Sequence, residues 1–211
     1  MGSTDNNDDP LDFEAAAKSM DPQLQAALTQ GRWHLLGLLG IVILFAAADS
    51  WSTLTDLAVA EGFAVLAAIL AGVGLAHLMH EWGHFLGARW SGANAPLKAE
   101  PALLAYDFDF KSNTNDHFLA MSYGGTLGNF LAIALIWWTI PMDEPHRIAL
   151  LASAIAATGF VAKLEWPVIL HARENKDPMA ALIHGFGGGL PTFRNALLVG
   201  GTVGLIAYWM L

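Results

Sequence analysis

Five long apolar stretches constrain the fold of this chain more than any other feature of its sequence. They occupy residues 33–48, 57–90, 118–140, 148–170 and 196–211. A transmembrane helix needs about 20 apolar residues, so the second, third and fourth stretches are long enough, whereas the first and fifth must recruit flanking residues. Charged residues make up 14% of the chain, against roughly 25% in soluble domains. The sequence therefore predicts an all-α, polytopic membrane helix bundle with about five transmembrane helices.

The first thirty residues differ from the rest of the chain in charge. Six of the 19 acidic residues fall there, with one lysine. We predict an acidic N-terminal tail over residues 1–30, in which residues 11–30 can form an interfacial amphipathic helix, and a single transmembrane domain over residues 31–211. No basic run suggests a nucleic-acid partner, and the absence of cysteine excludes disulfides and thiolate metal sites. The six acidic residues are Asp5, Asp8, Asp9, Asp12, Glu14 and Asp21.

The placement of lysine and arginine predicts an orientation. In a five-span bundle nine of these ten residues fall on one side, and only Arg147 falls on the other. Because cytoplasmic loops are enriched in lysine and arginine, we expect a cytoplasmic N-terminus and a C-terminus outside, in a bacterial inner (plasma) membrane. The nine are Lys18, Arg32, Arg89, Lys98, Lys111, Lys163, Arg173, Lys176 and Arg194.

The second apolar stretch contains the string HEWGH at residues 80–84. Residues four apart share one face of a helix, so His80 and His84 can hold one metal ion, for which zinc (Zn²⁺) is the expected cofactor. Glu81 can take a proton from a water whose pKa the zinc lowers to about 7. In a chain of 211 residues with 8 histidines, chance produces this string about 0.01 times. Ionisable groups inside a membrane are costly, which favours a metal site over two structural histidines.

These motifs carry a resemblance to a known family. The string HEWGHF at residues 80–85, followed by ARWSG at 88–92, resembles the site-2 protease family of intramembrane zinc metalloproteases. The string GGTLGN at 124–129 resembles that family's second signature. The resemblance covers a three-helix catalytic core at about 57–172, and implies cleavage of a membrane protein substrate within its transmembrane segment, in contact with the lipid bilayer.

The resemblance also implies a third zinc ligand, an aspartate usually followed by glycine on the fourth span. This chain has no Asp-Gly, and the matching position is Glu165. His80 and His84 precede Arg89 by about 14 and 8 Å of helix, and Glu165 precedes Arg173 by about 12 Å, so the three groups share one depth near the cytoplasmic side. Two alternatives are open: Glu165 can instead pair with Lys163 or reach the interface, and His171 is a rival ligand.

Asn129 reaches a similar depth in the third span. Its amide could bind the substrate backbone or the developing oxyanion, and Gly124 and Gly125 would let the backbone of the substrate approach closely. The alternative is packing of small residues with one interhelical hydrogen bond. The resemblance favours substrate binding by Gly124, Gly125 and Asn129.

The segment between the second and third spans is polar and contains Pro96, Pro101 and an alternating YDFDF at residues 106–110. We predict a short hairpin or loop there. The family resemblance implies that its strands can pair with an extended substrate. Asp107, Asp109 and the polar residues that follow them are interpreted as solvated loop residues.

Two functions follow from these features. The first is a zinc metalloendopeptidase in which His80, His84 and Glu165 bind the metal, Glu81 is the general base and Asn129 assists. The second is a catalytically idle subunit that serves as a scaffold in a larger membrane complex, which the missing Asp-Gly and the short chain suggest. A zinc-dependent transporter is a third option, but the chain lacks the additional intramembrane acids expected of a relay.

Overall fold

The structure is a computed structural model and describes residues 20–211. Its five long helices are α2 (Pro22–Thr55), α3 (Ala58–Trp90), α4 (Asn115–Thr139), α5 (Pro145–Asn175) and α7 (Leu190–Met210), with a short α6 (Pro178–Phe186) before the last. Residues 20–211 contain no strand, only an isolated antiparallel bridge between Leu97 and Tyr106. The all-α prediction is confirmed.

All five long helices are long and apolar enough to cross a membrane. Their outer faces carry exposed leucine, isoleucine and tryptophan side chains, as a lipid-facing surface requires. The prediction of a membrane helix bundle is therefore supported. Residues 22–30 form the first turns of α2 and continue into it without a break, whereas residues 1–19 of the predicted acidic tail lie outside the described residues.

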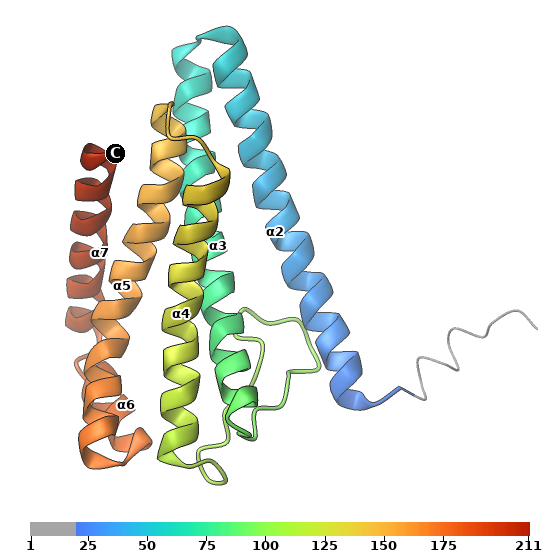
Figure 1. Ribbon diagram of the computed structural model, residues 1–211, viewed down its shortest axis with the longest axis vertical. Helices are drawn as coiled ribbons and strands as arrows, with labels where there is room; N and C mark the ends of the chain where they lie inside the picture. The colour runs from blue at the N-terminus through green and yellow to red at the C-terminus, as the bar shows by residue number, and fades with distance from the viewer. Residues whose placement is uncertain (1–19) are drawn as a thin grey trace, which may run out of the picture.

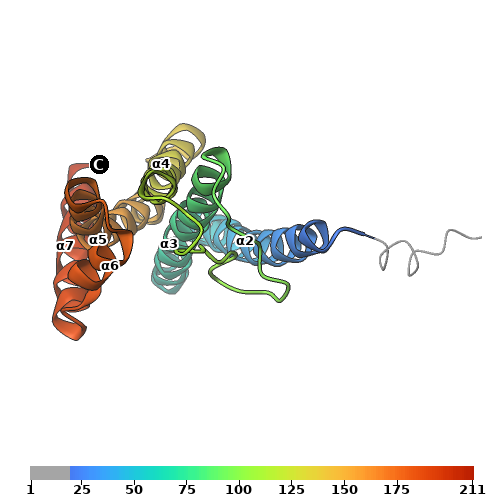
Figure 2. The same ribbon diagram turned by 90° about the horizontal axis from the view of Figure 1, so that it is seen from below.

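Successive long helices run in opposite directions, and α3 lies at the centre (Figure 1). It contacts α2, α4 and α5, while α7 packs on the far side of α5. Seen from below, α2 leans away from the other helices (Figure 2), and the loop from α3 to α4 lies between α3 and the lower part of α2 (Figure 1). As five spans require, α2 begins and α7 ends at opposite ends of the bundle.

Helix ends follow from capping residues and prolines. Asp21 accepts hydrogen bonds from the amides of Gln23 and Leu24 at the start of α2, and Thr114 forms a capping box at the start of α4. The helices α5 and α6 begin with Pro145 and Pro178, where a missing N–H costs nothing. These signals place the polar turns at the two ends of the bundle.

Small residues bring α3 and α4 into backbone contact. A Cβ on Gly83 would lie 2.3 Å from the carbonyl oxygen of Gly124, and one on Gly128 would lie 2.0 Å from that of Met79. Only glycine permits such an approach between helices. The close crossing fixes the rotation of α3 and turns His80 and His84 towards the bundle interior.

Candidate metal centre

Three metal-binding side chains from two helices converge near one end of the bundle. The Nε2 atoms of His80 and His84 lie 2.8 Å apart, and Oε1 of Glu165 lies 3.1 Å from the first and 3.2 Å from the second. The two histidines project from one face of α3, and Glu165 reaches them from α5. Within residues 20–211 this is the one group of three or more such side chains that could hold a metal ion.

The second nitrogen of each imidazole is occupied by a partner on α4. Nδ1 of His84 lies 2.9 Å from the carbonyl oxygen of Met121. Because a carbonyl only accepts, Nδ1 carries the proton and the Nε2 lone pair of the neutral ring faces the centre. Nδ1 of His80 lies 3.0 Å from the side-chain amide of Asn129. When the Asn129 amide is turned by 180°, its oxygen accepts a hydrogen bond from Nδ1 of His80. His80 then has the same tautomer as His84, with the proton on Nδ1 and the lone pair on Nε2.

The donor set fits a zinc ion. Two imidazole nitrogens and one glutamate oxygen are a ligand set of catalytic zinc sites, which leave a fourth position open. The other carboxylate oxygen of Glu165, Oε2, is buried and has no hydrogen-bond partner. A buried carboxylate oxygen without a partner is unfavourable in a protein interior, and a cation beside Glu165 would compensate for it. Glu165 makes its ion pairs with the two histidines, so the alternative of a Lys163 partner is not what the structure shows.

His171, the rival ligand, lies elsewhere. Its ring stacks on that of His184 in α6, with centroids 4.5 Å apart and an interplanar angle of 14°. It is not a member of the group formed by His80, His84 and Glu165. The structure thus brings together the three residues predicted as ligands and leaves the alternative outside.

Glu81 lies next to the centre, at the wall of a cavity. The cavity has a volume of about 360 Å³, and Glu81, His84 and Glu165 all line it. Glu81 is only 8% exposed, and its carboxylate lies 3.9 Å from Nδ1 of His77, one turn earlier on α3. A buried carboxylate beside a metal-binding group can serve as a general base.

Gly124, Gly125 and Asn129 lie in the interface of α3 and α4. A Cβ on Gly124 would lie 2.2 Å from the carbonyl oxygen of Gly83, and one on Gly125 would lie 2.3 Å from Cε1 of His84. Asn129 is 3% exposed and contacts His80. These contacts are the ones expected if the glycines serve helix packing and Asn129 forms an interhelical hydrogen bond. Binding of substrate by the three residues stays a prediction.

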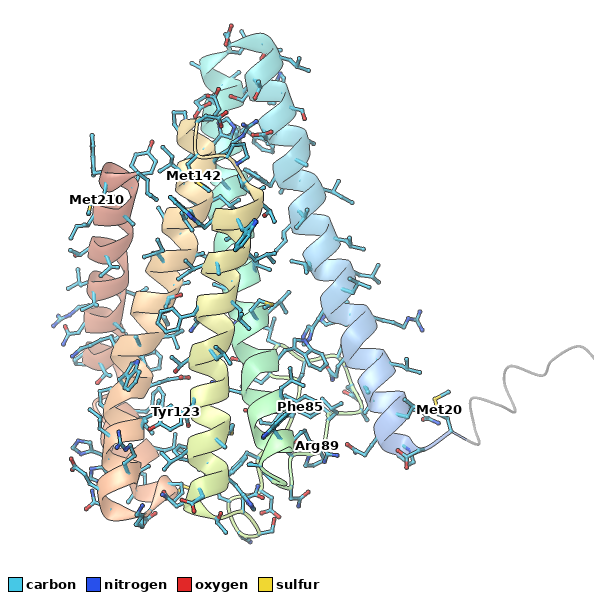
Figure 3. The ribbon with its side chains drawn as sticks, viewed as in Figure 1. Met20, Phe85, Arg89, Tyr123, Met142 and Met210 are labelled. Atoms are coloured by element: carbon cyan, nitrogen blue, oxygen red, sulfur yellow. The ribbon has the colours of Figure 1, made fainter. Side chains whose placement is uncertain are left out.

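The loop at residues 91–114 folds back on itself through a single antiparallel bridge and contributes to the cavity. The amide of Lys98 donates to the carbonyl of Ala105, and that of Asp107 donates to Pro96, on either side of the bridge at Tyr106. Tyr106 lines the cavity with Glu81. Its ring packs on Phe85, 5.9 Å away, which lies low on α3 beside this loop (Figure 3). Burial, followed by the nearby charges of Glu81 and Glu165, raises the pKa of Tyr106 above its ordinary value.

Buried polar side chains of α2 hold this loop in place. Gln30 is fully buried, donates to the carbonyls of Lys98 and Glu100 at 2.8 and 2.5 Å, and accepts from the amide of Ala102 at 3.2 Å. His34 bridges the loop and α3, because Nε2 lies 2.9 Å from the carbonyl oxygen of Ala102 and Nδ1 accepts from the indole of Trp82 at 3.0 Å.

The contacts of Gln30 and His34 with the loop, and helix α6, were not predicted from the sequence. Gln30 and His34 lie four residues apart at the edge of an apolar stretch. Polar side chains at such positions indicate that both are buried against other protein groups and hydrogen-bonded to them. The signal for α6 is Asp177 followed by Pro178, a capping residue before a proline. Leu182 and Phe186 of α6 line the cavity, so this short helix belongs to the site.

Comparison with protein-family models, curated proteins and solved structures found no match to this chain.

Proposed function

We propose that this chain is an intramembrane zinc metalloprotease, resembling the site-2 proteases, that hydrolyses peptide bonds within the transmembrane segments of other membrane proteins. The observation that carries the proposal is the meeting of His80, His84 and Glu165 beside a buried general base, Glu81, at one cavity. A purely structural site would need the three ligands and would have no use for a cavity with a carboxylate at its wall.

Zinc is the metal proposed for His80, His84 and Glu165. When bound in such a site, zinc acts as a Lewis acid and makes water a competent nucleophile near neutral pH. The contacts of the two Nδ1 atoms with Met121 and Asn129 keep both rings in the tautomer and orientation that a metal needs. Asn129 is therefore a positioning residue for His80.

Glu81 carries the proton in the proposed reaction. It receives a proton from the water as the new C–O bond forms at the substrate carbonyl, and it then delivers this proton to the amide nitrogen, so that the C–N bond breaks and the amine leaves. Its place at the cavity wall allows it to meet both the water and the scissile bond. Glutamine at this position would keep the shape of the side chain and could not take the proton.

Tyr106 is the residue proposed to hydrogen-bond the substrate's carbonyl oxygen. It lines the cavity together with Glu81, His84 and Glu165, and its protonated hydroxyl is able to donate. A donor placed where negative charge develops stabilises the transition state. Asn129 is less suited to this role, because its amide is occupied by His80.

The proposed membrane, orientation and substrate are those that the sequence predicts. The substrate is a membrane protein that enters from the bilayer, and the site lies near the cytoplasmic side of a bacterial inner membrane with the C-terminus outside. The metal centre lies at the end of the bundle that also holds Arg89 and Arg173, as that orientation requires.

The test combines zinc content and cleavage. Wild-type protein and a Glu81→Gln variant are purified in detergent for elemental analysis, and each is co-expressed with tagged single-span membrane proteins whose fragments are followed on blots. We expect about one zinc per chain in both, with fragments from the wild type alone. Glu174→Gln, an exposed glutamate on the same helix as Glu165, is the matched control and should cleave normally.

Two results would reject the proposal. Cleavage by Glu81→Gln at the wild-type rate would show that Glu81 is not the general base. Purification without zinc, without cleavage and always with a larger membrane complex would favour the alternative of an idle scaffold subunit.

A further inference from the structure

Beyond its polar end, the cavity at the metal centre is apolar. Glu81, His84 and Glu165 occupy one part of its wall. The remaining wall is built mainly from α4, α5 and α6, through Phe118, Met121, Val168, Ile169, Leu182 and Phe186. These side chains do not bind metal and do not carry protons, so the proposed chemistry leaves them without a role.

Helix α6 closes this apolar part of the cavity and is held firmly against α5. Ala181 is fully buried, and a Cβ on Gly185 would lie 2.2 Å from Cγ2 of Val168. The close approach at Gly185 fixes the distance between α6 and Val168, and both contribute to the wall. The side chains of Leu182 and Phe186 therefore limit the room that a ligand has next to Glu165.

We propose that this cavity is a side-chain pocket that selects substrates with a large apolar residue, of the size of leucine, methionine or phenylalanine, beside the scissile bond. The inference depends on the proposed function and names the substrate class of the same site. The volume of about 360 Å³ holds one such side chain together with the adjoining backbone.

Charged side chains are excluded on electrostatic grounds. With a divalent cation bound, the charges of the cation, Glu165 and Glu81 balance, so a charged substrate side chain would lose its water and find no partner. Small side chains fit but leave part of the pocket unfilled. An apolar pocket distinguishes ligands that differ by one methylene by about 10- to 200-fold.

A series of hydroxamic acids tests the pocket without requiring cleavage. The members share a succinyl hydroxamate, which binds zinc, and differ in one side chain: methyl, isobutyl, benzyl or carboxymethyl. Their dissociation constants are measured on the zinc-loaded full chain in detergent. We expect the isobutyl and benzyl compounds to bind about 10- to 200-fold more tightly than the methyl and carboxymethyl compounds.

Two neighbouring residues of α6 provide a variant and its matched control. Leu182→Trp narrows the pocket and should weaken the benzyl compound at least tenfold while leaving the methyl compound unchanged. Ile183→Trp places the same side chain on the adjacent position, which is 67% exposed, and should change neither. The wild-type series is decisive even where the Leu182 variant does not fold.

The outcomes separate this inference from the proposed function. A zinc-loaded chain that binds all four compounds equally, or prefers the carboxymethyl compound, would overturn the pocket alone. A chain that holds no zinc would overturn the proposed function and, with it, this inference.

Discussion

Replacing Gly125 by alanine should damage the metal centre through one methyl group. A Cβ there would lie 2.3, 2.5 and 2.6 Å from three atoms of the His84 ring, whereas ordinary contacts begin at 3.4 Å. The ring must therefore move by about 1 Å, a displacement that can cost a site about 100-fold in function. The movement also strains the 2.9 Å contact between Nδ1 of His84 and Met121. We expect zinc affinity to fall about 10- to 100-fold, the usual cost of disturbing the residues that orient a metal ligand.

The assay is a zinc titration of the purified protein in competition with a chromophoric chelator. Gly201→Ala is the matched control, because a Cβ on Gly201 meets no atom within 4 Å, and its zinc affinity should equal that of the wild type. Circular dichroism establishes that both variants keep their helices. Wild-type zinc affinity in a folded Gly125→Ala protein would show that α4 does not confine the His84 ring.

Three further predictions concern other parts of the molecule. Tyr106→Phe keeps the packing on Phe85 and should lower kcat about 100- to 1,000-fold without loss of zinc, as measured by cleavage rates and elemental analysis; an unchanged kcat would exclude a donor role. Gln30→Ala removes three hydrogen bonds to the loop and should expose the bond after Lys98 to trypsin while zinc affinity stays at the wild-type value; continued resistance to trypsin would mean that the loop is held by other contacts. His146 is fully buried between Asp49 and Glu61, at 2.7 and 3.0 Å, so His146→Ala should destabilise the fold by about 1 to 3 kcal/mol in thermal unfolding. Asp143→Asn removes only the exposed ion pair of Asp143 with Arg147 and should have little effect.

The sequence predicted the parts of this structure that depend on composition and local spacing. Apolar length indicated the helices, outright for α3, α4 and α5 and with flanking residues for α2 and α7, because a segment in lipid must satisfy its backbone hydrogen bonds internally. The spacing of His80 and His84 placed both on one face of α3. Glu165 was identified by the family resemblance and supported by its depth, since α3 and α5 run in the same direction and reach equal levels at equal distances from Arg89 and Arg173.

The parts that the sequence did not predict depend on contacts between distant segments. Gln30 binds loop groups some seventy residues away, a pairing that no periodicity encodes. Asn129 meets His80 because the glycines at the crossing of α3 and α4 set the rotation of both helices. Helix α6 has nine residues, too few for a hydropathy signal, and its place at the cavity follows from packing on Val168.

The most direct test of the metal centre is X-ray absorption at the zinc edge on the purified protein, compared with a Glu165→Ala variant. We expect a shell of two imidazole nitrogens with oxygen ligands at about 2.0 to 2.2 Å in the wild type. The variant should lose the carboxylate oxygen together with most of its zinc. An identical spectrum and zinc content in the two proteins would show that Glu165 does not bind the metal.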